Sequence, residues 1–406
     1  MDRSARVGVS DSAPEPSRPV RWDLFCRVID NLGDAGVCWR LARALTAACG
    51  DRVRLYIDAP SALVGLAGCD PPHAPGVQVY GWDAPADAAA PIGANAARQP
   101  IDAQWAEASI AAFACRPPEA YLQRLARREA PPVRINLEYL SAEEWVGGAH
   151  ALRSPHPRLA LDEFFFFPGF TPATGGLLRE PGLLERRDAW QADPGRRASL
   201  ARELGIPATE MPERWISLFC YAHAELEDWL DALSRGHERL RLLVTEGAAR
   251  EALAAAGLPR LANGVTVACG QLELTAIPFL VQDRYDELLW SCDLNVVRGE
   301  DSFVRAQWAG RPLLWHAYPQ AGDAHLPKVR AFALRYLQGL GSAAAGPIGQ
   351  LLEAWNTGRG IDRRWPAAWR EHDAWRQQAR AWAQTLAAMP DLVSRLRSFC
   401  MDRLDS

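Results

Sequence analysis

The sequence lacks the features that mark secreted, membrane-spanning or nucleic-acid-binding proteins. Its nine cysteines are odd in number and none is spaced as C-x-x-C, which argues against a disulfide framework and a structural zinc site. No run of about 18 apolar residues is present, so no transmembrane helix is predicted. A net charge of −4 argues against binding nucleic acid through excess basic residues. We therefore expect a cytoplasmic protein that binds neither nucleic acid nor membrane.

The motifs of several large enzyme classes are also missing. The chain has no G-x-S-x-G elbow, no G-x-G-x-x-G fingerprint, no P-loop and no H-E-x-x-H pair. The Asp-x-Asp signature of many metal-dependent sugar transferases is absent as well. These absences disfavour serine hydrolases, dinucleotide-dependent enzymes and zinc hydrolases. We expect a protein that needs neither a cofactor nor a metal ion.

The composition is that of a globular protein with more than one core. Of 406 residues, 49% are hydrophobic and 23% are charged, and this length predicts two domains. Residues 1–19 are polar and contain Pro and Ser without an apolar stretch, so they predict a disordered leader and no secretory signal.

Two arrays of alternating strands and helices follow. Apolar, β-rich runs predict strands, and apolar residues at helical spacing predict the helices between them. The expected strands of the first array include 22–29, 53–57 and 133–137, and those of the second array include 215–220, 240–244, 265–268, 277–281, 294–297 and 313–315. This pattern predicts an α/β protein with two Rossmann-like domains, whose ligands bind beyond the carboxyl ends of the strands.

The domain boundaries follow from composition. We place the first domain at residues 20–180 and the second at 205–374. A stretch rich in charge, Pro and Gly at 179–197 predicts a linker. Residues 367–404 are rich in Ala, Leu and Arg and predict a helical tail, whose last helices, at about 375–406, we expect to join the first domain.

Two carboxylates stand four residues apart in the loop predicted after the first strand. Asp30 and Asp34 are accompanied there by Asn31, Gly33 and Gly36. One Asp could cap a helix beginning near Val37, but a helix needs only one N-cap. The functional alternative is a general base, or a carboxylate that holds a cationic acceptor.

A second polar loop, R-G-E-D-S at 298–302, follows an apolar strand and opens a predicted helix. Arg298 and the first N–H groups of that helix, with Asp301 and Ser302, could bind a diphosphate, and Glu300 could accept a hydrogen bond from a sugar hydroxyl. The alternative is a capped helix with a surface ion pair. Tyr221 and Gln282, at other predicted strand ends, could stack on a base and read its edge, although a structural role is the more common one for either residue alone.

Three blocks of the sequence resemble the bacterial elongation factor P arginine rhamnosyltransferases, the EarP family. They are WDLFCRVIDNLGDAGVCWRLARAL at 22–45, INLEYLSAEEW at 135–145 and PFLVQDRYDELLWSCDLNVVRGEDSFVRAQWAGRPLLWHAYPQ at 278–320. The last block is long and specific. Residues 1–19, the region 60–110 and the tail carry little of the resemblance.

The resemblance implies a GT-B fold, two Rossmann-like domains facing a cleft, with the acceptor bound by the first domain and the nucleotide sugar by the second. It implies transfer of L-rhamnose from dTDP-β-L-rhamnose to an arginine of elongation factor P, with inversion, which activates that translation factor. The functional carboxylates of the family fall on Asp30, Asp34 and Glu300. Its donor-site positions fall on Phe219, Tyr221, Phe279, Gln282, Tyr285, Arg298, Asp301 and Ser302.

On this basis we expect Asp34 to act as the base, with Asp30 holding the guanidinium or supporting the loop. Two other readings stay open. The chain could be a GT-B transferase or a nucleotide-sugar epimerase that acts on a small molecule. It could also be a non-catalytic protein that binds the factor, although both carboxylate sites are intact.

Overall fold

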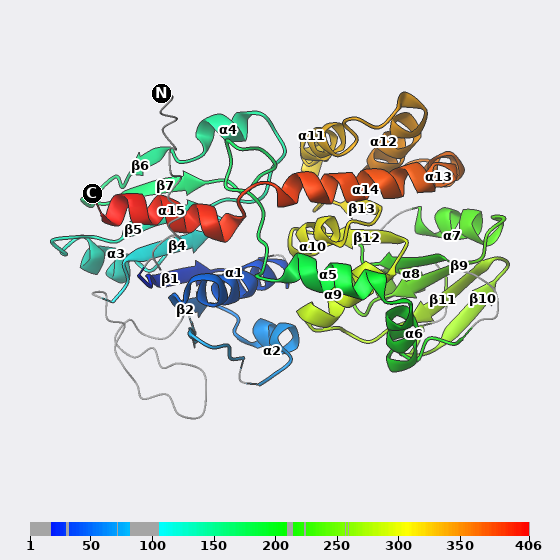
Figure 1. The fold of residues 1–406 in the computed structure, drawn as a ribbon, viewed down its shortest axis with the longest axis horizontal. Helices are drawn as coiled ribbons and strands as arrows, with labels where there is room; N and C mark the ends of the chain where they lie inside the picture. The colour runs from blue at the N-terminus through cyan, green and yellow to red at the C-terminus, as the bar shows by residue number, and fades with distance from the viewer. Residues whose placement is uncertain are drawn as a thin grey trace, which may run out of the picture.

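The protein consists of two α/β lobes that lie side by side, each built around one sheet (Figure 1). The computed structural model describes residues 18–29, 32–70, 72–81, 105–208, 214–222, 225–255, 257–258 and 260–405. The expected leader, residues 1–19, lies outside the described residues except for its last two. The two lobes confirm the predicted α/β class and the two Rossmann-like units of the GT-B fold.

The first lobe contains a seven-stranded sheet of order β3-β2-β1-β4-β5-β7-β6, parallel apart from the β6–β7 pair. Its central strands are buried on both faces, which explains why they read as continuous apolar runs. The strands are β1 (Arg21–Cys26), β2 (Arg52–Ile57), β3 (Val77–Gly81), β4 (Ala108–Ala112), β5 (Val133–Leu137), β6 (Arg153–Pro155) and β7 (Asp162–Phe166). The helices are α1 (Gly33–Cys49), α2 (Ser61–Ala67), α3 (Glu119–Leu125) and α4 (Trp145–Ala149).

The second lobe repeats this plan with six strands in the order β10-β11-β9-β8-β12-β13. Only β10 runs antiparallel to its neighbour among the described pairs. The strands are β8 (Arg214–Leu218), β9 (Leu240–Val244), β10 (Thr266–Cys269), β11 (Leu272–Ala276), β12 (Leu294–Arg298) and β13 (Leu313–His316). The predicted strand at 277–281 is wrong, because β11 ends at Ala276 and the apolar residues beyond it form an irregular segment that leads into α9.

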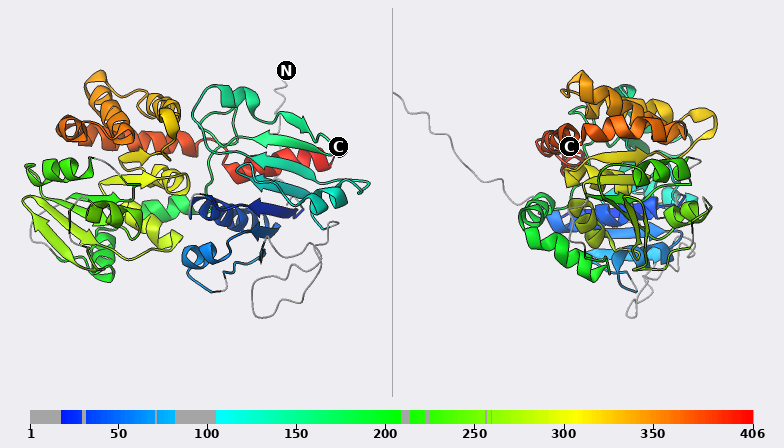
Figure 2. Two further views of the ribbon diagram at one scale, coloured as in Figure 1. Left: turned by 180° about the vertical axis from the view of Figure 1, so that it is seen from behind. Right: turned by 90° about the vertical axis from the view of Figure 1, so that its right-hand side faces the viewer.

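The helices of the second lobe cover both faces of its sheet (Figure 2). They are α7 (Leu226–Ser234), α8 (Ala248–Ala255), α9 (Gln282–Ser291), α10 (Asp301–Ala309), α11 (Leu326–Tyr336), α12 (Ser342–Thr357) and α13 (Ile361–Arg370), with a short 3-10 turn at Ala321–Asp323. The predicted linker is largely helical, since α5 (Leu183–Ala192) and α6 (Pro194–Glu203) occupy it. Asp193 caps α6 and Pro194 opens it, so the Pro- and Gly-containing sequence starts a helix here.

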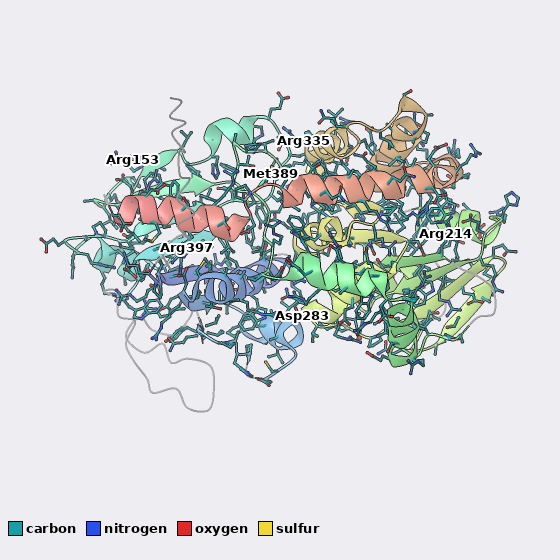
Figure 3. The ribbon with its side chains drawn as sticks, viewed as in Figure 1. Arg153, Arg214, Asp283, Arg335, Met389 and Arg397 are labelled. Atoms are coloured by element: carbon teal, nitrogen blue, oxygen red, sulfur yellow. The ribbon has the colours of Figure 1, made fainter. Side chains whose placement is uncertain are left out.

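The C-terminal tail returns the chain to the first lobe. Helix α14 (His372–Ala387) lies along the second lobe, and α15 (Leu392–Leu404) packs on the first, with Met389 between them (Figure 3). Leu392 and Leu396 are buried in the hydrophobic core of the first lobe. Arg397 of α15 also pairs with buried Asp51, at 3.4 Å. The chain therefore crosses between the lobes twice.

Both sheets reverse their strand order at one position, beside β1 in the first and beside β8 in the second. Ligands of open α/β sheets bind at such positions, outside the carboxyl ends of the strands. The loops after β1, β8 and β12 are therefore the places to look for a site. Across the described ranges, no helix is long and apolar enough to cross a membrane.

Candidate active site between the two lobes

Helix α1 begins earlier than the sequence indicated and brings Asp34 into its first turn. The helix starts at Gly33, and its N-cap residue Leu32 makes no side-chain cap. Asp34 is 3% exposed, and its Oδ2 accepts a hydrogen bond from the Ile29 amide at 2.8 Å. Its Oδ1 lies 3.4 Å from the Tyr139 hydroxyl, beyond the end of β5. Asp34 is therefore held by the loop before its helix and does not serve as the N-cap.

Two residues of the acceptor-side loop, Asp30 and Asn31, lie outside the described residues. Their expected roles stay predictions. Gly33 and Asp34, the other two, both line a cavity between the lobes.

Helix α10 opens directly after β12 and presents Glu300 at its N-cap. Gly299 connects the two elements with φ 62°, a conformation that favours glycine. The Glu300 Oε2 accepts a hydrogen bond from the Leu140 amide of the first lobe at 2.9 Å. The Ser302 hydroxyl is bonded to both the amide and the carbonyl of Arg298, which closes the turn. This turn aims the N-terminus of α10 at the space between the lobes.

The first cavity encloses about 730 Å³, partly open to solvent, in front of this helix terminus. All the predicted donor-site residues except Tyr221 line it: Phe219, Phe279, Gln282, Tyr285, Arg298, Glu300, Asp301 and Ser302. Its aromatic and polar lining is typical of a small-molecule site. Tyr221 does not line this cavity, but its ring centroid lies 4.7 Å from the guanidinium carbon of Arg298, which does.

Arg298 lies between aromatic rings at the edge of the first cavity. Its guanidinium is 4.6 Å from the Phe219 ring centroid and 4.7 Å from that of Tyr221. Such stacking fixes the plane of a guanidinium and leaves its N–H groups directed outward. Together with the positive end of α10, Arg298 can therefore bind an anionic group.

Two uncharged polar atoms of residues that line the first cavity are buried without a hydrogen-bond partner among the described residues. They are the Gln282 side-chain oxygen and the Tyr285 hydroxyl. Buried polar atoms are rarely left unpaired in native proteins, because an unmade hydrogen bond is costly. Phe279, by contrast, is 42% exposed and lies across the cavity mouth, near Gly65 of the first lobe. A ligand in the first cavity would therefore meet the polar atoms of Gln282 and Tyr285 in its interior and the aromatic ring of Phe279 at its opening.

A second cavity of about 990 Å³ adjoins the first. It is lined by Asp34 and Tyr139 from the first lobe and by Tyr318, His325 and Lys328 from the second. Gly33, Gly299 and Glu300 line both cavities, so the two spaces meet at Glu300. A ligand in one cavity can therefore reach a ligand in the other.

Glu300 has an unusual protonation equilibrium at this junction. Burial raises its pKa to about 8, and the nearby Asp34 carboxylate adds to the rise, while the Leu140 amide and Lys328 oppose it. The Glu300 carboxyl is therefore mostly neutral at pH 7 and can donate a hydrogen bond. Two acidic side chains thus face the same space, and a carboxyl group with a raised pKa beside a second acid is typical of functional sites.

The sequence did not single out several residues of this site. Arg305 lines the first cavity, and Tyr139 and Lys328 line the second. The composition could have drawn attention to Lys328, because it is the single lysine of the sequence. Tyr139 lay inside one of the blocks that carried the resemblance. Arg305 carried no local signal, since its position depends on how α9 packs against α10.

The geometry favours two adjacent ligands, an anionic one in the first cavity and one that approaches Asp34 in the second. Asp34 can accept a proton there, and Glu300 can bridge the two ligands. Within the described ranges, no group of three or more His, Cys, Asp or Glu side chains is placed to hold a metal ion. The expectation of a metal-free reaction stays a prediction.

Comparisons with known proteins agree with these features. The family model described as Elongation-Factor P (EF-P) rhamnosyltransferase EarP matches residues 22–401. The protein-arginine rhamnosyltransferase of Pseudomonas aeruginosa is 44% identical over 389 residues, covering 94% of this chain and 99% of that protein. The enzyme of the same name from Shewanella oneidensis is 34% identical over 402 residues, covering 94% of this chain and 98% of that protein.

A solved structure is similar over the same extent. It is presented as the structural basis for EarP-mediated arginine glycosylation of translation elongation factor EF-P, and it matches with a TM-score of 0.66 and 33% identity. The match covers 94% of this chain and 99% of that one. These findings confirm the resemblance and the expected enzyme class: the chain belongs to the EarP family of protein-arginine rhamnosyltransferases.

Proposed function

We propose that the protein transfers L-rhamnose from dTDP-β-L-rhamnose to an arginine side chain of elongation factor P, with inversion at the anomeric carbon. The observation that carries this proposal is the junction of the two cavities at Glu300. An anion-binding cavity on one side and the Asp34 carboxylate on the other suit a nucleotide-sugar donor and a cationic acceptor. The acceptor protein and the donor come from the family to which the chain belongs.

In this proposal the donor occupies the first cavity. The diphosphate lies against Arg298 and the N-terminus of α10, whose positive end stabilises the charge that develops on the leaving group. Phe279 and Phe219 offer rings for stacking, and Gln282 offers an unpaired oxygen to a base edge. No metal ion is required, because these groups already supply positive charge where the bond breaks.

The acceptor arginine enters the second cavity beside Asp34. A guanidinium is a poor nucleophile because it is protonated, with a pKa above about 12, and its lone pairs are delocalised. As the side-chain nitrogen forms its bond to the anomeric carbon, the bond from that carbon to the dTDP oxygen breaks, and the nitrogen releases one proton to Asp34. One direct displacement inverts the anomeric centre. Neutral Glu300 can donate a hydrogen bond to the sugar or the diphosphate.

Intact-mass analysis of purified elongation factor P tests the proposal. Incubation with this protein and dTDP-L-rhamnose should add the mass of one deoxyhexose, and substitution of the acceptor arginine by lysine should abolish the addition. Addition to a free peptide or a small molecule, but not to the folded factor, would favour a small-molecule transferase. Tight binding of the factor without any transfer would favour a non-catalytic role.

A further inference from the structure

A buried network of charges joins the two lobes beside the site. Arg40 of α1 is 1% exposed, and its Nε and Nη2 donate to both carboxylate oxygens of Glu180, at 2.6 and 2.9 Å. Its third nitrogen, Nη1, donates to Asp301 Oδ1 at 2.7 Å. Glu180 belongs to the segment that connects the lobes, and Asp301 opens α10. A single guanidinium thus ties together the first lobe, the connection and the second lobe.

The other side of Asp301 is held equally firmly. Its Oδ2 accepts from Gln282 Nε2 and from Arg305 Nε, both at 3.2 Å, and Arg305 also donates to Asp286 at 2.8 Å. Burial alone would raise the pKa of Asp301, but Arg305 and Arg40 together lower it below its usual value. Asp301 is therefore an ionised group with a bond to each lobe.

Helices α1 and α10 approach each other closely at Gly36, where even a methyl group would be crowded. A Cβ at Gly36 would lie 3.0 Å from Asp301 Oδ2 and 3.2 Å from Gln282 Nε2. The Gly36 carbonyl instead accepts a hydrogen bond from Gln282 Nε2 at 3.1 Å. The absence of a side chain allows the first turn of α1 to lie directly against the start of α10.

This contact determines where the two carboxyl groups of the site lie. Asp34 is in the first turn of α1, two residues before Gly36, and Glu300 is the N-cap of α10, one residue before Asp301. We propose that Arg40 is a positioning residue, which fastens α1 to α10 through Asp301 and so sets the place of Asp34 relative to Glu300 and the donor. Arg40 lines neither of the two large cavities, so it acts without touching either substrate.

The inference rests on the proposed function only for its kinetic consequence. The donor cavity is built mostly from the second lobe, so loss of the Arg40 contact leaves donor binding nearly intact. The base on α1 then meets the anomeric carbon in many orientations. Misplacement of a reacting group by about 1 Å can cost on the order of 100-fold in rate. We therefore expect a loss in kcat with little change in donor affinity.

The test compares Arg40 with a matched buried arginine. Arg54 makes a bidentate bond to Asp23 inside the first sheet, at 2.6 and 2.7 Å, and lines neither cavity. Breaking either buried pair by substitution with Met should lower thermal stability. At a temperature where circular dichroism shows each variant folded, R40M should lose at least about tenfold in kcat, with donor Kd within about threefold of wild type. R54M should keep its kcat, and R40K should recover part of the loss.

Two further variants keep the inference testable if R40M does not fold. G36A leaves Arg40 intact but places a methyl group 3.0 Å from Asp301 Oδ2, so the contact between α1 and α10 must shift, and it should lower kcat in the same way. Hydrogen exchange measured by mass spectrometry needs no turnover: R40K should raise exchange in the first turns of both α1 and α10, whereas R54K should raise it within the first sheet.

The outcomes separate this inference from the proposed function. Wild-type protein that transfers no rhamnose would overturn the proposed function, and the exchange experiment would still decide the role of Arg40. An active wild type with R40K, R40M and G36A equally active would overturn the inference alone. The inference would also be overturned if R40M and R54M lost activity only in proportion to their unfolded fraction. It would be overturned as well if R40K left hydrogen exchange in α1 and α10 unchanged.

Discussion

The first cavity takes most of its walls from the second lobe, whereas the second cavity takes its reactive side chains from both lobes. Leu32, Gly33 and Leu66 are the only first-lobe residues among those that line the first cavity in the described part of the chain. In the second cavity, Asp34 and Tyr139 face Glu300 and Lys328 across the boundary. The difference indicates that the second lobe can bind an anionic ligand nearly alone. The reaction, in contrast, requires that the side chains of both lobes are held in the correct relative position.

The substitution D34N should give the largest effect, and it tests whether reaction depends on the first lobe while donor binding does not. Asparagine keeps the shape of the side chain but cannot accept the proton, so kcat should fall about 10²- to 10⁴-fold. Donor Kd should change far less than kcat, because Asp34 does not line the first cavity and affects the donor only through the pKa of Glu300. Rhamnosylation rates and calorimetric titration with dTDP-L-rhamnose measure the two quantities. D283N, at the start of α9 (Figure 3), is the control, since Asp283 is exposed, pairs with Arg43 at 3.2 Å and lines neither cavity. Normal turnover by D34N would refute the assignment of the base.

The complementary substitution removes the positive charge of Arg298 from the first cavity. R298M should weaken donor binding about 10- to 100-fold, because a charge-assisted hydrogen bond to the diphosphate is lost. The exposed Arg330, paired with Glu353 on the far side of α11, offers the control R330M. Calorimetry with dTDP alone distinguishes a diphosphate contact from a sugar contact. If R298M bound dTDP with an unchanged Kd, Arg298 would not be part of the diphosphate-binding site.

Glu300 belongs to both cavities, and its titration should appear in donor binding. Its pKa of about 8 means that the carboxyl is neutral below that pH and ionised above it. An ionised carboxylate repels the diphosphate, so donor Kd should be nearly flat below pH 7 and weaken about fivefold from pH 8 to pH 9. E300Q should abolish this dependence, because glutamine does not titrate. Donor binding that strengthens as pH rises would contradict the assigned protonation state.

Lys328 should produce the smallest effect. Its positive charge lowers the pKa of Glu300, so K328M should move the midpoint of the pH dependence of donor binding to higher pH. K328R keeps the charge and should leave the midpoint in place. The same titrations measure both variants. A midpoint that moves downward in K328M, or equally in both variants, would show that Lys328 does not act on Glu300 through its charge.

Local patterns in the sequence predicted much of the fold. The buried central strands were recognised as apolar runs, and the C-terminal tail as helical from its composition. The errors occurred where packing overrides local preference. Helix α1 begins at Gly33 and runs through Gly36, where its close contact with Asp301 of α10 leaves little room for a side chain. The predicted linker forms helices because α5 packs on α9 of the second lobe.

The site shows the same limits. Residues next to strand ends, such as Arg298, Glu300 and Phe219, could be predicted because parallel strands direct their carboxyl ends to one edge. Arg40 and Glu180 could not, since the partners of each lie far away in the chain. Arg305 could not either, since its position at the cavity depends on its bond to Asp286 of α9. Asp301 illustrates both: its place at the cavity was predicted, but its bonds to Arg40 and Arg305 were not.

The sequence by itself determined the two α/β arrays, the family and the polar loops at strand ends, because periodicity and local motifs act over short stretches of chain. Only the tertiary structure decided that Asp34 and Glu300 face one space, that Glu300 is mostly neutral there, and that Arg40 joins the lobes. These properties depend on burial and on charges brought together from distant segments. Neither burial nor such proximity is encoded in any single stretch of residues.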